Sequence, residues 1–136
     1  MDTKKILLIE DDHFINQLYL RVLKQAGFKT IIASNGSEGV DLVDGSFNLI
    51  LLDVMLPKID GINVLKKLKE NPQTKKIPVV LLTNLGQESV IKAAFEIGAQ
   101  GYILKMSVTP YEMVEKIKQF IKDPSFQMDP KELDLD

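Results

Sequence analysis

The chain has 136 residues, 45% of them hydrophobic, which is enough to bury the core of one ordinary globular domain. It contains no cysteine, which excludes a disulfide framework and cysteine-based zinc or thiol chemistry. The formal net charge is only −2, a balance that gives no indication of nucleic-acid binding.

Short apolar runs alternate with segments of helical periodicity. The apolar runs are typical of buried strands in a parallel sheet, and they span residues 5–9, 29–33, 49–52, 77–82 and 101–104. The helical segments, bounded by capping and breaking residues, span residues 15–26, 36–44, 60–71, 87–97 and 110–122. The last helix has the clearest start, because Thr109, Pro110 and Glu112 form a capping-box pattern. Five alternations predict an α/β fold, a doubly wound five-stranded parallel sheet with helices on both faces.

The third predicted strand ends in a carboxylate. Leu49 to Leu52 are four consecutive aliphatic residues, and Asp53 follows them directly. An aspartate there is also an ordinary turn residue. In open α/β sheets, however, ligands bind outside the carboxyl ends of the strands, so Asp53 lies where chemistry or metal binding takes place.

Other polar residues follow the remaining strands in the same way. They are Glu10, Asp11 and Asp12 after the first strand, Thr83 at the end of the fourth and Lys105 after the fifth. Because parallel strands all point the same way, we expect these side chains to converge on one crevice with Asp53. Clustered carboxylates repel one another unless a cation shares the site. Oxygen ligands without His or Cys favour a hard ion such as Mg²⁺. A carboxylate nucleophile beside a metal, an amine and a hydroxyl has the parts needed for phosphoryl transfer.

On these motifs the sequence resembles the receiver domain of two-component response regulators. The resemblance covers residues 4 to about 122. The residues that carry it are the acidic pair Glu10 and Asp11, Asp53 followed by Pro57 and Gly61, Thr83, and Lys105 with Tyr102 three positions earlier. It implies a flavodoxin-like (βα)₅ domain that receives a phosphoryl group from a phosphohistidine.

The resemblance also implies a role for each site residue. Asp53 would be the phosphoacceptor and would bind Mg²⁺ together with Asp11 and the carbonyl of Met55, while Glu10 would act through water. Thr83 would bond a phosphoryl oxygen after transfer, and Lys105 would pair with another. Tyr102 would turn inward behind Thr83 and act with it as a switch.

Most of these residues also have an ordinary structural interpretation. Asp12 is better explained as the N-cap of the first helix than as a metal ligand. His13 is expected to be an exposed residue of the first helical turn, with the donor histidine on another protein. Taken singly, Lys105 would be a solvated loop lysine and Tyr102 an edge-strand aromatic residue. Their convergence with Asp53 is what favours the functional interpretation.

The chain departs from the family pattern at several positions. Met106 stands where the family usually has proline in a cis peptide bond, and a cis bond to a residue other than proline is costly. Asn84 stands where the family usually has a small residue. The two variable positions over the phosphoacceptor are Met55 and Leu85, both apolar, which predicts slow self-dephosphorylation. The charged pairs of the transcriptional regulators' dimer face are not evident, so a monomer or weak dimer is expected.

Three other classes deserve comparison. A dehalogenase-type phosphatase would have a second aspartate where Met55 stands, and a nucleotide- or flavin-binding protein would have a glycine-rich loop in place of EDDHF. A degenerate receiver, acting only as a protein interaction module, would be expected to have lost an acid or the lysine. It remains the alternative function, and we expect the chain to be a signalling domain rather than an enzyme.

The predicted domain spans residues 1–122, and residues 123–136 follow it with five acidic residues against Lys131. This segment is expected to be a short, flexible acidic tail without an output domain. The predicted partners are a sensor histidine kinase or histidine phosphotransfer protein and a downstream protein target, without direct contact to nucleic acid or membrane. No stretch has the length of a signal sequence or membrane span, so a cytoplasmic location is expected.

Overall fold

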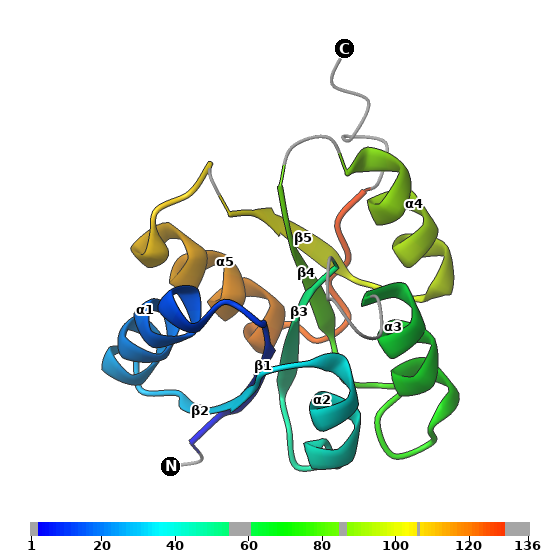
Figure 1. The fold of residues 1–136 in the computed structure, drawn as a ribbon, viewed down its shortest axis with the longest axis horizontal. Coiled ribbons are helices and arrows are strands. Elements are labelled where there is room, and N and C mark those ends of the chain that lie inside the picture. The colour runs from blue at the N-terminus through cyan, green and yellow to red at the C-terminus, as the bar shows by residue number, and fades with distance from the viewer. Residues whose placement is uncertain (1–2, 55–60, 85–86, 106, 130–136) are drawn as a thin grey trace.

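The computed structural model describes residues 3–54, 61–84, 87–105 and 107–129. Within these residues strands and helices alternate along the chain (Figure 1). The strands are β1 (Lys5–Ile9), β2 (Lys29–Ala33), β3 (Leu49–Asp53), β4 (Val79–Thr83) and β5 (Gly101–Leu104). The helices are α1 (His13–Gln25), α2 (Gly36–Leu42), α3 (Gly61–Glu70), α4 (Glu88–Ile97) and α5 (Pro110–Lys122).

The strands form one parallel sheet in the order β2-β1-β3-β4-β5. The predicted doubly wound α/β fold is therefore confirmed. Since β2 lies on one side of β1 and β3 on the other, the strand order reverses between β1 and β3. This topological switch point is where ligands bind in open α/β sheets.

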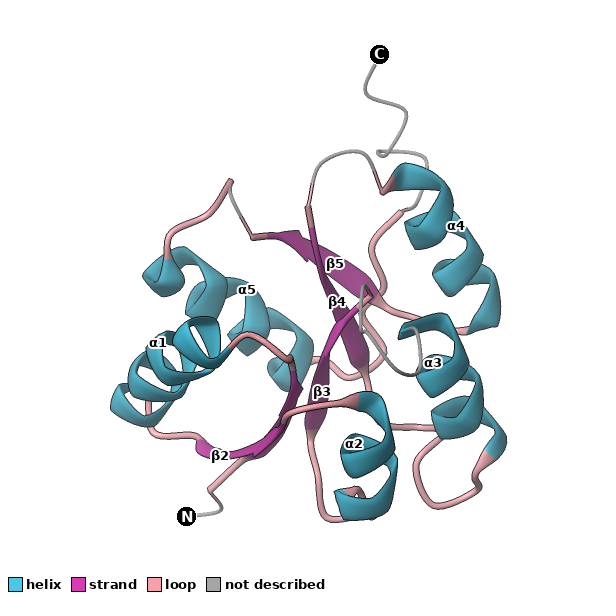
Figure 2. Cartoon of the chain, viewed as in Figure 1, coloured by secondary structure: helices cyan, strands magenta, loops and turns pink. Residues whose placement is uncertain are grey.

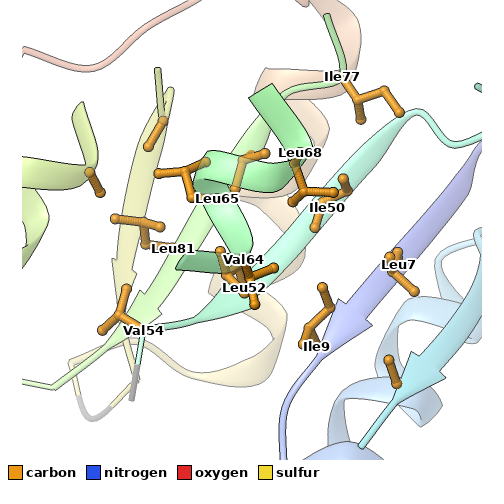
Figure 3. Close-up of a cluster of buried hydrophobic side chains, with 14 of the residues drawn as sticks. Leu7, Ile9, Ile50, Leu52, Val54, Val64, Leu65, Leu68, Ile77 and Leu81 are labelled. Carbon is orange, nitrogen blue, oxygen red and sulfur yellow. The ribbon is translucent and has the colours of Figure 1, made fainter. Parts of the chain in front are cut away.

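Helices cover both faces of the sheet, with α1 and α5 on one side and α2, α3 and α4 on the other (Figure 2). Successive strand residues point to opposite faces, so each strand contributes to two apolar clusters. Leu7 and Ile9 pack with Ile50 and Leu52 on the α2–α3–α4 face (Figure 3). Ile6, Leu8, Leu49 and Leu51 pack on the α1–α5 face. Burial on both faces explains why these strands read as continuous apolar runs.

The helix starts follow the predicted capping chemistry. Asp12 caps α1, and its carboxylate accepts a hydrogen bond from the Ile15 N–H at 3.0 Å. Asn35 caps α2 through the Glu38 N–H. Thr109 and Glu112 form the complete capping box of α5. The ordinary interpretation of Asp12 as an N-cap is therefore confirmed.

Several element boundaries differ from the sequence prediction by one or two residues, and two of these differences have a clear local cause. α2 ends at Leu42, because the backbone of Val43 is already extended. β4 begins at Val79 rather than at Ile77. There the Ile77 N–H closes a turn onto the Thr74 carbonyl, and Pro78 has no N–H to donate to the sheet.

Residues 124–129, the first part of the predicted tail, lie against the domain. Phe126 and Met128 are half-buried against β5 and α5, and the Met128 N–H donates to the Gln100 carbonyl at 2.8 Å. The two apolar side chains and the hydrogen bonds to Gln100 hold this part of the segment against the domain. The remainder of that segment, 130–136, lies outside the described residues.

None of the helices in the described ranges has the length and apolar character needed to cross a membrane.

Candidate functional site

The strand register brings the predicted site residues together at one edge of the sheet. Ile9 pairs with Leu52, so Glu10, directly after β1, lies at the same level as Asp53 at the end of β3. Asp53 pairs with Leu82, and Thr83 pairs with Leu104. Glu10, Asp53, Thr83 and Lys105 therefore lie at the ends of four neighbouring strands, with Thr83 one residue and Lys105 two residues beyond the level of Asp53. The convergence that the sequence predicted is present in the fold.

Asp53 is the last residue of β3 and is only 4% exposed. The start of α3 packs directly onto this strand end, where the Gly61 N–H donates to the Val54 carbonyl at 3.1 Å. A Cβ atom on Gly61 would lie 2.5 Å from the Val54 Cα and 2.8 Å from the Asp53 carbonyl oxygen. The backbone that carries Asp53 is thus fixed by a close approach that only glycine permits.

Hydrogen bonds fix the peptide groups on both sides of Glu10. Its N–H donates to the Ala33 carbonyl at 3.1 Å, and its carbonyl accepts from the Asn16 side-chain amide at 2.7 Å. Asn16 is buried on α1, so this bond ties the acidic loop to the first helix. Glu10 is 1% exposed, whereas Asp11 is exposed.

Lys105 bridges the two buried carboxylates. Its ammonium nitrogen lies 3.1 Å from Asp53 Oδ2 and 3.1 and 3.2 Å from the two oxygens of Glu10. The Lys105 side chain is 11% exposed. Its backbone N–H donates to the Thr83 carbonyl at 2.8 Å, which holds it in line with β4. Lys105 is therefore a site residue and not a solvated loop lysine.

The electrostatics of this group oppose full ionisation of its buried carboxyls. Burial, and then the hydrogen-bonding contact and charge of Asp53, raise the pKa of Glu10 to about 8, although Lys105 opposes the shift. Burial lowers the pKa of Lys105, but the charges of Asp53 and Glu10 outweigh it and the net shift is upward. The Lys105 ammonium therefore offsets only part of the cost of ionising Glu10 in this buried position.

The acidic group fits a metal ion. Carboxylate oxygens of Glu10, Asp11 and Asp53 lie within 4.8 Å of one another. All three donors are oxygens, two of them come from buried side chains, and the group has excess negative charge. This donor set suits a hard divalent cation.

Thr83 and Tyr102 lie on the neighbouring strands. Thr83 is buried, and its hydroxyl donates to the Asn84 carbonyl at 3.2 Å. Tyr102 pairs with Leu81 in register, packs against the α2–α3–α4 cluster and meets the Phe95 ring at a centroid distance of 6.4 Å. The paired role of Thr83 and Tyr102 as a switch stays a prediction.

Several predictions concern residues outside the described ranges. They are the metal-binding carbonyl of Met55, Pro57 of the motif, the apolar guard positions Met55 and Leu85, and the peptide bond to Met106.

A cavity of about 540 Å³ opens beside the acidic group, between α1 and the segment that leads into α5. Acidic side chains and Lys105 line one part of it, and Ile15, Leu18 and Val108 line another. Tyr19 also lines it, and burial raises the pKa of its phenol. Tyr19 and Asn16 were not predicted as site residues, because both lie on the buried face of α1. Their polar groups among apolar neighbours are the signal in the sequence that could have pointed to them.

Comparison with known proteins agrees with this geometry. The family model of the response regulator receiver domain matches residues 6–118. The transcriptional regulatory protein CpxR of Escherichia coli is 39% identical over 118 residues, which are 87% of this chain and 49% of that protein. The transcriptional regulatory protein SrrA of Staphylococcus aureus is 37% identical over 121 residues, which are 88% of this chain and 48% of that protein. The chain spans about half the length of these curated relatives.

Solved structures show the same fold. A CheY-like receiver domain protein from Methanospirillum hungatei superposes with a TM-score of 0.82 at 28% identity, covering 90% of this chain and 96% of that one. A putative response regulator from Chloroflexus aurantiacus gives a TM-score of 0.79 at 30% identity, covering 89% and 99%. With the matching family model, the register and the acidic group all in agreement, this chain belongs to the response regulator receiver domain family.

Proposed function

We propose that the chain accepts a phosphoryl group on Asp53 from a phosphohistidine of a partner histidine kinase or histidine phosphotransfer protein, and that it signals to a protein target through the resulting change of conformation. The observation that carries the proposal is the placement of Asp53. Its buried carboxylate lies 3.1 Å from the Lys105 ammonium, in a group of three carboxylates that fits a divalent cation.

In the proposed reaction an oxygen of Asp53 attacks the phosphorus atom. The bond between phosphorus and the donor imidazole nitrogen breaks, its electron pair stays on that nitrogen, and a new bond joins phosphorus to the Asp53 oxygen. Mg²⁺, when bound by Glu10, Asp11 and Asp53, would neutralise charge that develops on the phosphoryl oxygens. Lys105 supplies a fixed positive charge on the same side of the carboxylate.

Thr83 would act after the transfer. Its hydroxyl now donates to the Asn84 carbonyl at 3.2 Å, a local contact that a phosphoryl oxygen would replace with a stronger, charge-assisted one. The chain thus assists its own phosphorylation by positioning and charge neutralisation. It differs from an enzyme in that the phosphorylated molecule is the chain itself and not a separate substrate.

The test is phosphorylation by acetyl phosphate with Mg²⁺, followed by intact-mass measurement. Wild type should gain one phosphoryl group, and Asp53→Asn should gain none. Asp12→Asn is the matched control, because it removes a neighbouring carboxylate from an exposed position and keeps a residue that caps helices well. Equal mass gain in wild type and Asp53→Asn would contradict the proposal.

The degenerate receiver, a phosphorylation-independent interaction module, is the competing interpretation. It requires a site that cannot react, whereas Glu10, Asp11, Asp53, Thr83 and Lys105 are all present at the sheet edge. Absence of any mass gain in wild type, with acetyl phosphate and also with a phosphorylated histidine phosphotransfer protein, would favour that alternative.

A further inference from the structure

The segment after α5 turns back and lies against β5, the last strand of the sheet. In Figure 1 it runs from the end of α5 past β5 toward α4. The Met128 N–H donates to the Gln100 carbonyl at 2.8 Å. The Gln100 side-chain amide donates in turn to the carbonyls of Pro124 at 2.7 Å and Phe126 at 3.2 Å. The backbone and the side chain of Gln100 thus both hold the segment that follows α5.

The side chains of this segment alternate between exposed and half-buried, as in an extended chain packed on one face. Ser125, Gln127 and Asp129 are exposed, whereas Phe126 and Met128 are half-buried. The Phe126 ring meets the Phe120 ring at a centroid distance of 5.2 Å. Met128 packs against the apolar clusters on both faces of the sheet. The segment therefore covers the edge of the sheet at β5 and contacts the apolar clusters of both faces there.

β5 is shaped to receive these side chains. A Cβ atom on Gly101 would lie 2.2 Å from the Phe120 ring and 3.0 Å from the Met128 sulfur. The absence of a side chain at Gly101 therefore makes room for both. One residue further along, the Tyr102 N–H donates to the Met128 sulfur at 3.3 Å. A thioether is a weak acceptor, so this contact is easier to replace than a bond to a carbonyl.

This segment lies in a groove between β5 and α5, and two hollows along the groove are lined partly by the side chains of the segment itself. One of about 170 Å³ lies between Phe120, Phe126 and Met128, and one of about 280 Å³ continues along the strand past Leu104 and Val108. Lys116 lines both hollows. An extended peptide with apolar side chains two residues apart and an acidic residue beside them matches this groove, and residues 126–129 have that pattern.

We propose that residues 124–129 form a strap that occupies the edge of β5 and closes the surface of α4, β5 and α5 to other chains. When the strap leaves, the same groove binds an extended peptide of the chemistry just described. The strap competes with such a peptide as a ligand tethered to the domain. For a short flexible tether the effective concentration is on the order of millimolar. This inference does not depend on the phosphorylation of Asp53.

The test opens the strap in the full chain with the double substitution Phe126→Ser and Met128→Ser. A fluorescent peptide of residues 123–129, DPSFQMD, should bind the double variant at least tenfold more tightly than wild type, measured by fluorescence anisotropy. The same peptide with serine in place of its phenylalanine and methionine should bind neither protein. Hydrogen exchange of the Tyr102 amide, which loses its contact with the Met128 sulfur, should be faster in the double variant.

Gln100→Met is a second, milder way to open the strap, because it removes the two bonds from the Gln100 side chain and leaves the apolar contacts in place. It should change peptide affinity in the same direction by a smaller factor. Phe14→Ser is the matched control, since it removes an aromatic side chain that is 75% exposed on α1. Equal peptide binding by wild type and both strap variants, or no binding by any of them, would overturn the proposal.

Discussion

The ammonium of Lys105 lies 3.1 Å from Asp53 Oδ2, although 52 positions separate the two residues in the sequence. Parallel register brings them together, because Asp53 pairs with Leu82 on β4, and β4 pairs through Thr83 with Leu104 on β5. Asp53 is the last residue of β3, and the backbone of Lys105 is hydrogen-bonded to Thr83 of β4, so the sheet positions both residues. The sheet register therefore places the Lys105 ammonium next to the proposed phosphoacceptor.

Replacing Lys105 with methionine should destabilise the metal-free protein. The change keeps the apolar stem but leaves Glu10 and Asp53 without their shared counter-ion in a buried position. Breaking a buried pair typically costs about 3–5 kcal/mol, and protonation of one carboxylate would reduce this to about 1–3 kcal/mol. Urea unfolding without Mg²⁺ measures it. Lys118→Met is the control, because Lys118 pairs with Glu115 on the exposed surface, and an effect no larger than the control's would contradict the pairing.

Replacing Asp11 with alanine should separate metal binding from stability. Asp11 is exposed but contributes to the group of three carboxylates, so its loss should change the metal-free stability by less than about 0.5 kcal/mol. The affinity for Mg²⁺ should fall by at least about tenfold, because removal of even an outer-shell partner costs that much. Calorimetric titration with Mg²⁺ provides the measurement. An unchanged affinity, as expected for the Asp12→Asn control, would rule out the role of Asp11.

Replacing Asn16 with leucine should disturb the backbone at Glu10, which the Asn16 side chain holds from α1. The side-chain amide of Asn16 donates to the Glu10 carbonyl at 2.7 Å in a buried position, and leucine has a similar size but no donor. An unsatisfied buried carbonyl costs about 1–3 kcal/mol. Unfolding experiments should show a loss in this range, and Mg²⁺ affinity should fall as well. Loss of stability with unaltered Mg²⁺ affinity would mean that Asn16 supports the fold without positioning the metal ligands.

The sequence was a good guide to the sheet and to the acidic group, for a physical reason. Strands buried on both faces are continuous apolar runs, and a polar residue such as Asp53 or Lys105 that follows one must lie at the sheet edge. The helix starts were equally visible, since Asp12 and Thr109 cap with their own side chains.

What the sequence did not reveal depends on contacts between distant segments. Asn16 has the position of an apolar stripe residue, and only the fold shows that its amide reaches the Glu10 carbonyl. The docking of Phe126 and Met128 depends on the space left at Gly101, which no local pattern displays. Packing between segments also buries Ile91 of α4 fully against the core, whereas Tyr111 of α5 stays exposed.

A phosphoryl mimic should change more than the loops around Asp53. Charge-assisted contacts to Thr83 and Lys105 would replace their present partners, and Thr83 lies on β4 next to β5, where Tyr102 contacts both Phe95 and Met128. We expect beryllofluoride with Mg²⁺ to alter amide hydrogen exchange in α4, β5 and the start of α5. Asp53→Asn with the same reagents is the control. Exchange changes confined to the loops at the sheet edge would show that the signal does not reach this surface.

Replacing Gly61 with alanine should damage the site through the backbone. The added methyl would lie 2.5 Å from the Val54 Cα and 2.8 Å from the Asp53 carbonyl oxygen, and neither backbone atom can turn away as a flexible side chain could. Either α3 or the end of β3 must move, so we expect a loss of about 1–3 kcal/mol, the usual cost of overpacking. Since the displaced segment carries Asp53, phosphorylation by acetyl phosphate should also slow. Gly45→Ala is the matched control, because its methyl would meet only the Gln73 carbonyl at an ordinary 3.5 Å. Equal unfolding midpoints for the two variants would show that α3 does not constrain the strand end that carries Asp53.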